Sequence, residues 1–127
     1  MSQKAILIVD DQPGVRTLLS LLCQEEGLTS ETAVNGLDAI NKIKDARPKM
    51  VVMDVRMPVM DGIAALKWIK KHYSDLPVVI MTAYAEEKSL EAAKETGIVD
   101  VWYKPFDIDE VRVKLKELLS KGDESCG

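Results

Sequence analysis

Acidic residues follow two of the most apolar segments of the chain, and this placement suggests metal or phosphoryl chemistry. Asp10 and Asp11 come directly after the apolar run 5–9, and Asp54 comes directly after the run 50–53. Consecutive Val, Ile, Leu and Met residues are typical of a strand that is buried on both faces, as in a parallel sheet. We therefore expect each acid in the loop at the carboxyl end of a central strand, where open α/β sheets keep their ligand sites.

Asp54 also has a simpler interpretation, in which its carboxylate only caps the helix that follows. Asp61 is better placed for capping, because Asp61-Gly62 stands directly before the apolar pattern of that helix. We therefore favour a chemical role for Asp54.

The composition is that of one globular domain. The chain has 127 residues, of which 46% are apolar and 30% charged, and its net charge is −4. A domain of this length buries roughly two thirds of its unfolded surface, so it needs no disulfide. The negative charge implies no general attraction to DNA or to an anionic membrane, and we expect no direct binding of nucleic acid.

Other features favour a cytoplasmic protein with free thiols. No run reaches the ~18 apolar residues of a membrane span, and the first apolar run is short and ends in two acids, unlike a signal peptide. Cys23 and Cys126 are far apart, which favours free thiols in a reducing compartment. We expect a folded domain over residues 1–121 and a flexible tail over 122–127.

The apolar patterning predicts five strands, each followed by a helix. The expected strands are 5–9, 29–34, 50–53, 77–81 and 100–103, and Asn35-Gly36 is the expected turn after the second of them. The expected helices are 14–26, 37–47, 63–73, 86–96 and a last one from residue 108 onward, introduced by a capping box at 107–110. The apolar residues expected on one face of the last helix are Ile108, Val111, Leu115, Leu118 and Leu119. Right-handed crossovers place such helices on both faces of a parallel sheet. The simplest architecture is a flavodoxin-like, doubly wound (βα)5 sheet of the α/β class with strand order 2-1-3-4-5.

The helix expected at 14–26 has more apolar surface than a core needs. Its apolar residues cover about 200° of the helix, whereas a core-facing stripe covers about 100°. Either this helix is unusually buried, or one flank exposes apolar side chains to a partner. The residues concerned are Val15, Leu18, Leu19, Leu21, Leu22 and Cys23.

Two further polar residues follow strands at the same edge of the expected sheet, namely Thr82 and Lys104. At an effective dielectric of about 20, carboxylates roughly 5 Å apart repel one another by about 3 kcal/mol per pair. A cation must therefore lie close to the acids. Lys104 is one candidate, and Mg²⁺, which prefers carboxylate, carbonyl and water ligands, is another. Asp54 would then be a nucleophile that forms an acyl phosphate, while Lys104 and Thr82 bind phosphoryl oxygens.

Over residues 4–120 the chain resembles the receiver domain of two-component response regulators. The motifs that carry the resemblance are Val9-Asp10-Asp11, Asp54-Val-Arg-Met-Pro58, Met60-Asp61-Gly62, Met81-Thr82-Ala83 and Lys104-Pro105-Phe106. The resemblance implies that Asp54 is the phosphoacceptor and that Asp11, Asp54 and the backbone carbonyl of Arg56 hold Mg²⁺. It assigns Asp10 a role mainly through water. It also implies that Thr82 and Lys104 contact the phosphoryl group and that the Lys104-Pro105 peptide bond is cis.

A narrower resemblance is to the single-domain regulators of bacterial sporulation phosphorelays. It is carried by Asp10-Asp11-Gln12-Pro13-Gly14, Asn35-Gly36-Leu37, Met81-Thr-Ala-Tyr84 and Lys104-Pro-Phe-Asp-Ile-Asp-Glu110. It implies a protein that accepts a phosphoryl group from a sensor histidine kinase and passes it to a histidine phosphotransferase. We expect this protein to be a monomer. The docking surface that it implies comprises Gln12, Gly14, Val15, Leu18, Tyr84, Pro105 and Phe106.

One position departs from the usual receiver pattern. Many receivers carry an aromatic residue or His three residues before the lysine, as a rotamer switch, whereas this chain has Val101 there. A relay protein that only accepts and transfers a phosphoryl group could function without such a switch. Alternatively, Val101 only packs well and carries no meaning for function.

Three other functions compete with the relay. A chemotaxis-type regulator would bind a target protein when phosphorylated. An aspartate-based Mg²⁺ phosphatase would want a second Asp two residues after Asp54, where this chain has Arg56, so at most slow hydrolysis of its own acyl phosphate is expected. A receiver used only as a binding scaffold would not need every polar position of the pocket to be filled, as it is here.

Overall fold

Five strands alternate with five helices in the part of the chain that the structure describes. The structure is a computed structural model that describes the backbone of residues 6–83 and 87–126 and the side chains of residues 6–83 and 88–117. The strands are β1 (Ile6–Val9), β2 (Ser30–Ala33), β3 (Met50–Asp54), β4 (Val78–Thr82) and β5 (Asp100–Tyr103). The helices are α1 (Pro13–Glu25), α2 (Gly36–Asp45), α3 (Gly62–His72), α4 (Glu87–Thr96) and α5 (Ile108–Cys126).

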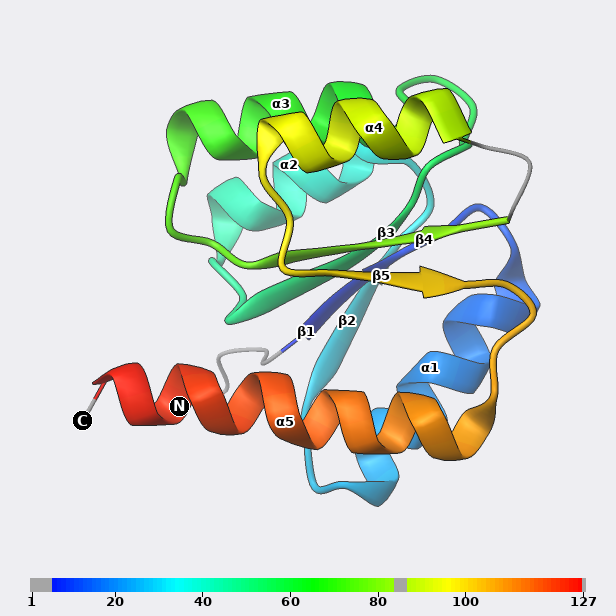
Figure 1. The fold of residues 1–127 in the computed structure, drawn as a ribbon, viewed down its shortest axis with the longest axis vertical. Helices are drawn as coiled ribbons and strands as arrows, with labels where there is room; N and C mark the ends of the chain where they lie inside the picture. Colours follow the sequence, from blue (N-terminus) through cyan, green and yellow to red (C-terminus); the bar gives the residue numbers. More distant parts are fainter. Residues whose placement is uncertain (1–5, 84–86, 127) are drawn as a thin grey trace.

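The strands form one parallel sheet in the order β2-β1-β3-β4-β5. Helices α2, α3 and α4 cover one face, and α1 and α5 cover the other (Figure 1). This is the flavodoxin-like, doubly wound arrangement that the strand–helix alternation predicts, so the predicted fold is confirmed. The order places β1 and β3 side by side in the middle of the sheet, with the acids at their carboxyl ends.

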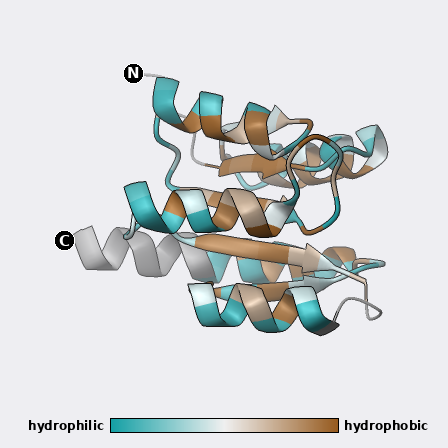
Figure 2. Cartoon of the chain, turned by 90° about the horizontal axis from the view of Figure 1, so that it is seen from above, coloured by the Kyte–Doolittle hydropathy of each residue, from teal (hydrophilic) through white to brown (hydrophobic). Residues whose placement is uncertain are grey.

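The core has two parts, because successive side chains of a strand point to opposite faces of the sheet. In β3, Val51 and Met53 pack toward α2, α3 and α4, whereas Met50 and Val52 pack toward α1 and α5. Figure 2 shows apolar residues on the sides of the helices that face the sheet. This burial on both faces explains why the central strands are unbroken apolar runs rather than alternating ones.

The ends of several elements follow from capping. Gly27 has φ +73° and Gly97 has φ +118°, so each supplies the left-handed conformation that often ends a helix. The side chain of Asp61 caps α3 by accepting a hydrogen bond from the Ala64 amide at 2.8 Å. The Asp107 carboxylate accepts bonds from the amides of Asp109 (2.9 Å) and Glu110 (3.2 Å) at the start of α5.

Three local expectations need correction. Asn35-Gly36 is not a separate turn, because Asn35 caps α2 by accepting a hydrogen bond from the Asp38 amide (2.8 Å), and Gly36 is the first helical residue. Asp54 is the last residue of β3 rather than a loop residue, because its position pairs with Met81 of β4. Ile108, expected on the core face of α5, is 43% exposed, because it lies at the first residue of that helix.

The wide apolar arc of α1 is only partly buried. Leu19, Leu22 and Cys23 lie in the core, Leu18 is half-buried, and Leu21 is 53% exposed. Of the two explanations that the sequence leaves open, the structure therefore favours an exposed apolar flank.

Helix α5 extends to Cys126, beyond residue 121, where the sequence places the end of the domain. The flexibility of residues 122–127 stays a prediction. Over residues 6–83 and 87–126, no helix combines the length and the apolar character that crossing a membrane requires.

Candidate functional site

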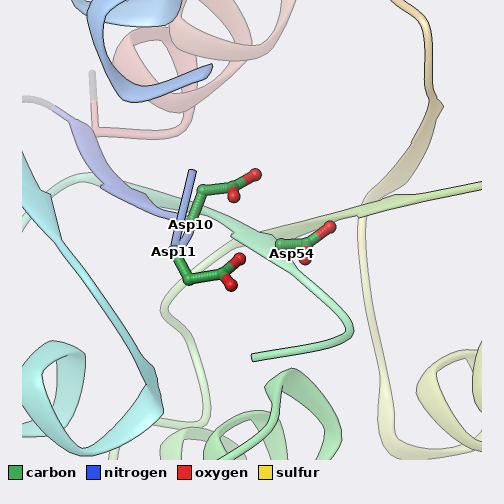
Figure 3. Close-up of side chains that lie close together, drawn as sticks. All are labelled: Asp10, Asp11 and Asp54. Carbon is green, nitrogen blue, oxygen red and sulfur yellow. The ribbon is translucent and has the colours of Figure 1, made fainter. Parts of the chain in front are cut away.

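Three carboxylates from two neighbouring strand ends gather at one edge of the sheet. One oxygen of each of Asp10, Asp11 and Asp54 can be chosen so that all three lie within 4.8 Å of one another. Figure 3 shows Asp10 and Asp11 just beyond β1 and Asp54 at the end of β3. Asp10 is fully buried, Asp54 is 8% exposed and Asp11 is exposed. Two acids are thus inside the protein, and the third faces solvent.

Lys104 supplies the cation that these acids require. Its Nζ lies 2.8 Å from Asp10 Oδ2 and 3.0 Å from Asp54 Oδ1, so one ammonium bridges two buried carboxylates. It also donates a long hydrogen bond to Gln12 Oε1 at 3.5 Å. The predicted meeting of Lys104 with the acids of β1 and β3 is confirmed in its geometry.

The alternation of side chains along the strands explains which groups meet. Asp10 and Asp54 are each two residues beyond a side chain that packs on the α1 and α5 face, namely Ile8 and Val52. They therefore start toward the same face of the sheet. Lys104 follows Trp102, another residue of that face, by the same step. Because all three side chains start toward the same face of the sheet, the ammonium can lie between the two buried carboxylates.

The loop after β5 is held against β4 where Lys104 begins. The Lys104 amide donates to the Thr82 carbonyl at 2.9 Å, which extends the pairing of β4 and β5 by one step. The Lys104-Pro105 peptide bond is cis, as the resemblance implies. These features place Lys104 at the same edge of the sheet as Asp54.

The electrostatics of the pair follow from burial and hydrogen bonding. Burial raises the pKa of Asp54 above its ordinary value, and the Asp10 carboxylate acts in the same direction, although Lys104 opposes both. For Lys104, burial acts to lower the pKa, but the hydrogen bonds to Asp10 and Asp54 outweigh it and leave the pKa raised. Lys104 therefore stays an ammonium, and its charge offsets the ionised acids.

Thr82 is the last residue of β4 and is 2% exposed. Its hydroxyl donates to the carbonyl of Ala83 at 3.0 Å. Its neighbour Met81 pairs with Asp54 across β3 and β4, so the hydroxyl belongs to the strand beside the candidate nucleophile. Contact of Thr82 with a phosphoryl group stays a prediction.

The loop from β3 to α3 approaches the backbone of Asp54 closely because Gly62 has no side chain. A Cβ on Gly62 would lie 2.2 Å from the Asp54 carbonyl oxygen, and the Gly62 amide donates to Val55 O at 2.8 Å. The Gly36 amide likewise donates to Met60 O at 2.9 Å, which joins the start of α2 to this loop. Neither contact was expected from the sequence, although Asp61-Gly62 and Asn35-Gly36 are visible there as motifs.

Arg16 is a second group that sequence reasoning missed. From α1 its Nη1 donates to the backbone carbonyl of Asp10 at 2.8 Å. No local signal marks this arginine, since an Arg at the fourth position of a helix ordinarily points to solvent.

Of the residues expected to bind a partner, those that the structure describes lie in the first half of α1, just before it, and in the loop after β5, near the acids. Gln12, Gly14 and Pro105 are exposed. Three apolar members, Val15, Leu18 and Phe106, are half-buried and pack against the core beneath α1 and α5. Tyr84 lies outside the described residues.

The donor set fits a hard divalent cation. Carboxylate oxygens are ligands that Mg²⁺ prefers, and the exposed Asp11 leaves the cluster open to water and to an incoming oxygen. The assignment of the Arg56 carbonyl as a further ligand stays a prediction.

Comparisons with known proteins agree with this geometry. The family model described as the response regulator receiver domain matches residues 6–116. Sporulation initiation phosphotransferase F of Bacillus subtilis (strain 168) is 43% identical over 119 residues, which are 94% of this chain and 96% of that protein. Regulatory protein AtoC of Escherichia coli (strain K12) is also 43% identical, over 114 residues, but this chain spans only 25% of its length. The crystal structure of the receiver domain of NtrX from Brucella abortus superposes with a TM-score of 0.84 at 31% identity, covering 91% of this chain and 98% of that one.

The match to the family model covers most of the chain, and the sheet order, the acidic cluster and the bridging lysine agree with it. The chain therefore belongs to the response regulator receiver domain family.

Proposed function

We propose that this receiver domain accepts a phosphoryl group on Asp54 from a phosphohistidine of a sensor histidine kinase and passes it to a histidine phosphotransferase. One observation carries the proposal: the Asp54 carboxylate lies at the end of a central strand, 3.0 Å from the Lys104 ammonium and beside two further acids. This is a nucleophile next to a charge that can neutralise phosphoryl oxygens. Residues 1–121 form the proposed receiver unit, as a monomer in the cytoplasm.

In the proposed reaction an oxygen of Asp54 attacks the phosphorus of the phosphohistidine. A new O–P bond forms as the P–N bond breaks, and the electron pair returns to the imidazole, which takes up a proton on its other nitrogen. Lys104 contributes by holding a positive charge where negative charge collects on the phosphoryl oxygens. Thr82 lies on the neighbouring strand, and its hydroxyl, which donates to the Ala83 carbonyl in this structure, would turn to donate to one of those oxygens.

Mg²⁺ would be held by Asp11, Asp54 and the Arg56 carbonyl, with Asp10 acting through water. When bound, it supplies Lewis-acid stabilisation of the charge on the transferring group. Asp10 keeps Lys104 in place through the 2.8 Å ion pair. The exposed position of Asp11 leaves this ligand accessible to a cation from solvent.

Two observations favour relay over binding of a target. The relative named a phosphotransferase matches this chain over 96% of its own length, whereas AtoC matches over a quarter. Val101, at the position of the usual aromatic switch, is a half-buried residue of β5 with a short aliphatic side chain. An aspartate-based phosphatase needs a general acid two residues after Asp54, and this chain has Arg56 there, which disfavours hydrolysis of external substrates.

Labelling with a small phosphodonor tests the acceptor. Incubation with acetyl phosphate and Mg²⁺ should add one phosphoryl group to the wild-type chain, measured by intact mass, and none to Asp54→Asn, because the amide is not a nucleophile. An Asp61→Asn variant is the matched control, since Asp61 is an exposed helix cap outside the cluster. Labelling of Asp54→Asn at another residue would refute the assignment.

A second assay tests the relay. The phosphorylated chain is mixed with purified histidine phosphotransferases from the same organism, and loss of label from Asp54 is followed together with its gain on a histidine. Transfer within seconds to minutes supports the relay. Retention of the label, with a target protein that binds only the phosphorylated chain, would instead identify a chemotaxis-type regulator.

A further inference from the structure

Asp10 is held on all of its polar atoms. Its amide donates to the Ala33 carbonyl of β2 at 3.1 Å. Its Oδ1 accepts a hydrogen bond from the Gln12 amide at 2.9 Å, and its Oδ2 pairs with Lys104 at 2.8 Å. Its carbonyl accepts the Arg16 guanidinium at 2.8 Å. Asp10 is therefore a fixed point to which β2, α1 and the loop after β5 are all joined.

The bond from Arg16 acts on the next residue as well. The carbonyl of Asp10 belongs to the planar peptide unit that joins Asp10 to Asp11, so fixing this oxygen fixes the plane from which Asp11 departs. Asp11 is exposed, in contrast to the buried side chain of Asp10. The direction of the Asp11 carboxylate therefore depends on its backbone.

Helix α1 itself does not stabilise the positive charge of Arg16. Arg16 is the fourth residue of α1, and the positive end of a helix dipole disfavours a cation there. The first turn of α1 carries no acidic residue that would compensate. The half-buried guanidinium is stabilised instead by the carbonyl at the end of β1.

From these contacts we propose that Arg16 is a positioning residue that orients the Asp10–Asp11 peptide and thereby aims the Asp11 carboxylate at the divalent cation of the site. The proposal depends on the proposed function, because it requires that the acidic cluster binds Mg²⁺. Arg16 acts through the backbone and touches neither the cation nor the phosphoryl group.

A positioning role and a purely electrostatic role of Arg16 predict opposite changes in Mg²⁺ affinity when the side chain is removed. As a charge near the acids, Arg16 repels Mg²⁺, so its removal would tighten binding of the cation. As a positioning group it holds a ligand in place, and loss of such outer contacts typically weakens metal affinity by about 10-fold to 100-fold. The sign of the change therefore separates the two roles.

The experiment measures the Kd for Mg²⁺ alone by isothermal titration calorimetry on the full chain. For Arg16→Met, which keeps most of the aliphatic stem, the Kd should rise about 10-fold. Lysine can still donate one hydrogen bond, so the Kd of Arg16→Lys should lie between that of Arg16→Met and that of the wild type. Lys70→Met is the matched control, because Lys70 also donates to a backbone carbonyl, that of Leu76 at 2.8 Å, but does so at the end of α3. Its Kd should equal that of the wild type.

A second cation separates positioning from general weakening of the fold. Mg²⁺ demands near-ideal octahedral geometry, whereas Ca²⁺ tolerates irregular ligands. If the Asp11 carboxylate is no longer correctly oriented, the affinity for Mg²⁺ should therefore fall more than the affinity for Ca²⁺. General destabilisation of the fold would lower both affinities equally. If Arg16→Met does not fold, the same comparison is made with Arg16→Lys.

The proposal is overturned if the Kd for Mg²⁺ is unchanged or lower in Arg16→Met, or if Mg²⁺ and Ca²⁺ weaken by the same factor. Failure of the Mg²⁺-dependent acceptor step of the proposed function gives a different result, because the wild-type chain itself would then bind no Mg²⁺ and take no label from acetyl phosphate.

Discussion

At the scale of single residues, the site is a balance between burial and pairing. Burial of Asp54 disfavours its charged form, and the nearby carboxylates of Asp10 and Asp11 add repulsion. The Lys104 ammonium offsets part of this cost through two contacts of 3.0 Å or less. The net effect on Asp54 is still a raised pKa, so the unphosphorylated pocket retains unfavourable charge that a cation can relieve.

Cys23 shows the same effect of burial without a partner charge. It lies in the core on the inner side of α1, and burial raises the pKa of its thiol from 9.0 to about 11. Between these two values the unfolded chain loses the thiol proton while the folded protein keeps it. Stability from this group is therefore complete below pH 9 and is lost as the pH rises toward 11.

The prediction for Cys23 is a difference between two pH profiles. From pH 8.5 to 11, the free energy of unfolding of the wild type should fall by roughly 2–3 kcal/mol more than that of Cys23→Ala, since each pKa unit corresponds to about 1.4 kcal/mol. Urea denaturation at each pH measures it, and the other titrating groups cancel in the comparison. Parallel profiles for the two proteins would show that the Cys23 thiol ionises normally in the folded state.

At the scale of elements, the position of Asp54 depends on how tightly the loop to α3 folds back on β3. The Gly62 amide, at the start of α3, bonds to the carbonyl of Val55, the first residue after β3, and the Gly36 amide joins the start of α2 to Met60 in this loop. Asp61 caps α3 immediately before Gly62. The loop is therefore fixed at both ends, and it passes within van der Waals distance of the Asp54 backbone.

Substitution of Gly62 tests this arrangement. The Cβ of Gly62→Ala would lie 2.2 Å from the Asp54 carbonyl oxygen, so the loop or the end of β3 must shift. We expect a loss of about 1–3 kcal/mol in the free energy of unfolding, the usual cost of overpacking, and slower labelling of Asp54 by acetyl phosphate.

Gly14→Ala is the matched control for Gly62. Nothing lies within 4 Å of the Cβ that it would add, and the residue is within α1. It should be neutral or stabilise the protein by up to about 1 kcal/mol, because Ala is the better helix former. Equal free energies of unfolding for the Gly62→Ala and Gly14→Ala variants would mean that the loop can move to accept the added Cβ without loss of stability.

At the scale of the whole molecule, the sheet order brings the carboxyl ends of β1, β3, β4 and β5 to one edge, which collects charges from all along the chain. A cation that binds only the folded cluster should stabilise the entire domain. At about 100 times its Kd, Mg²⁺ should add roughly 2.7 kcal/mol to the free energy of unfolding.

Thermal unfolding in EDTA and in Mg²⁺ measures this effect. The melting temperature of the wild type should rise with Mg²⁺ concentration, and that of Asp11→Asn should rise much less, because one ligand is lost while the buried Lys104 pairs remain. Identical melting temperatures of the wild type in EDTA and in Mg²⁺ would show that the acidic cluster is not a metal site.

The sequence by itself determined the five strands, their order and the acids and lysine at their ends. Short apolar runs bounded by turn residues, such as 50–53, favour strands buried on both faces, and right-handed crossovers leave few ways to arrange them. Residues at strand ends then gather at one edge whatever the details of packing. For this reason Asp10, Asp54, Thr82 and Lys104 could be named before any coordinates.

Only the tertiary structure decided the contacts within that edge. The pairing of Lys104 with Asp10 joins residues 94 positions apart, and it depends on which face of the sheet each side chain leaves. The bond of Arg16 to a backbone carbonyl, the close approach of Gly62 to Asp54 and the exposure of Leu21 likewise depend on how helices and loops pack on the sheet. Local periodicity specifies which elements form, but it holds no information on distances between side chains of different elements.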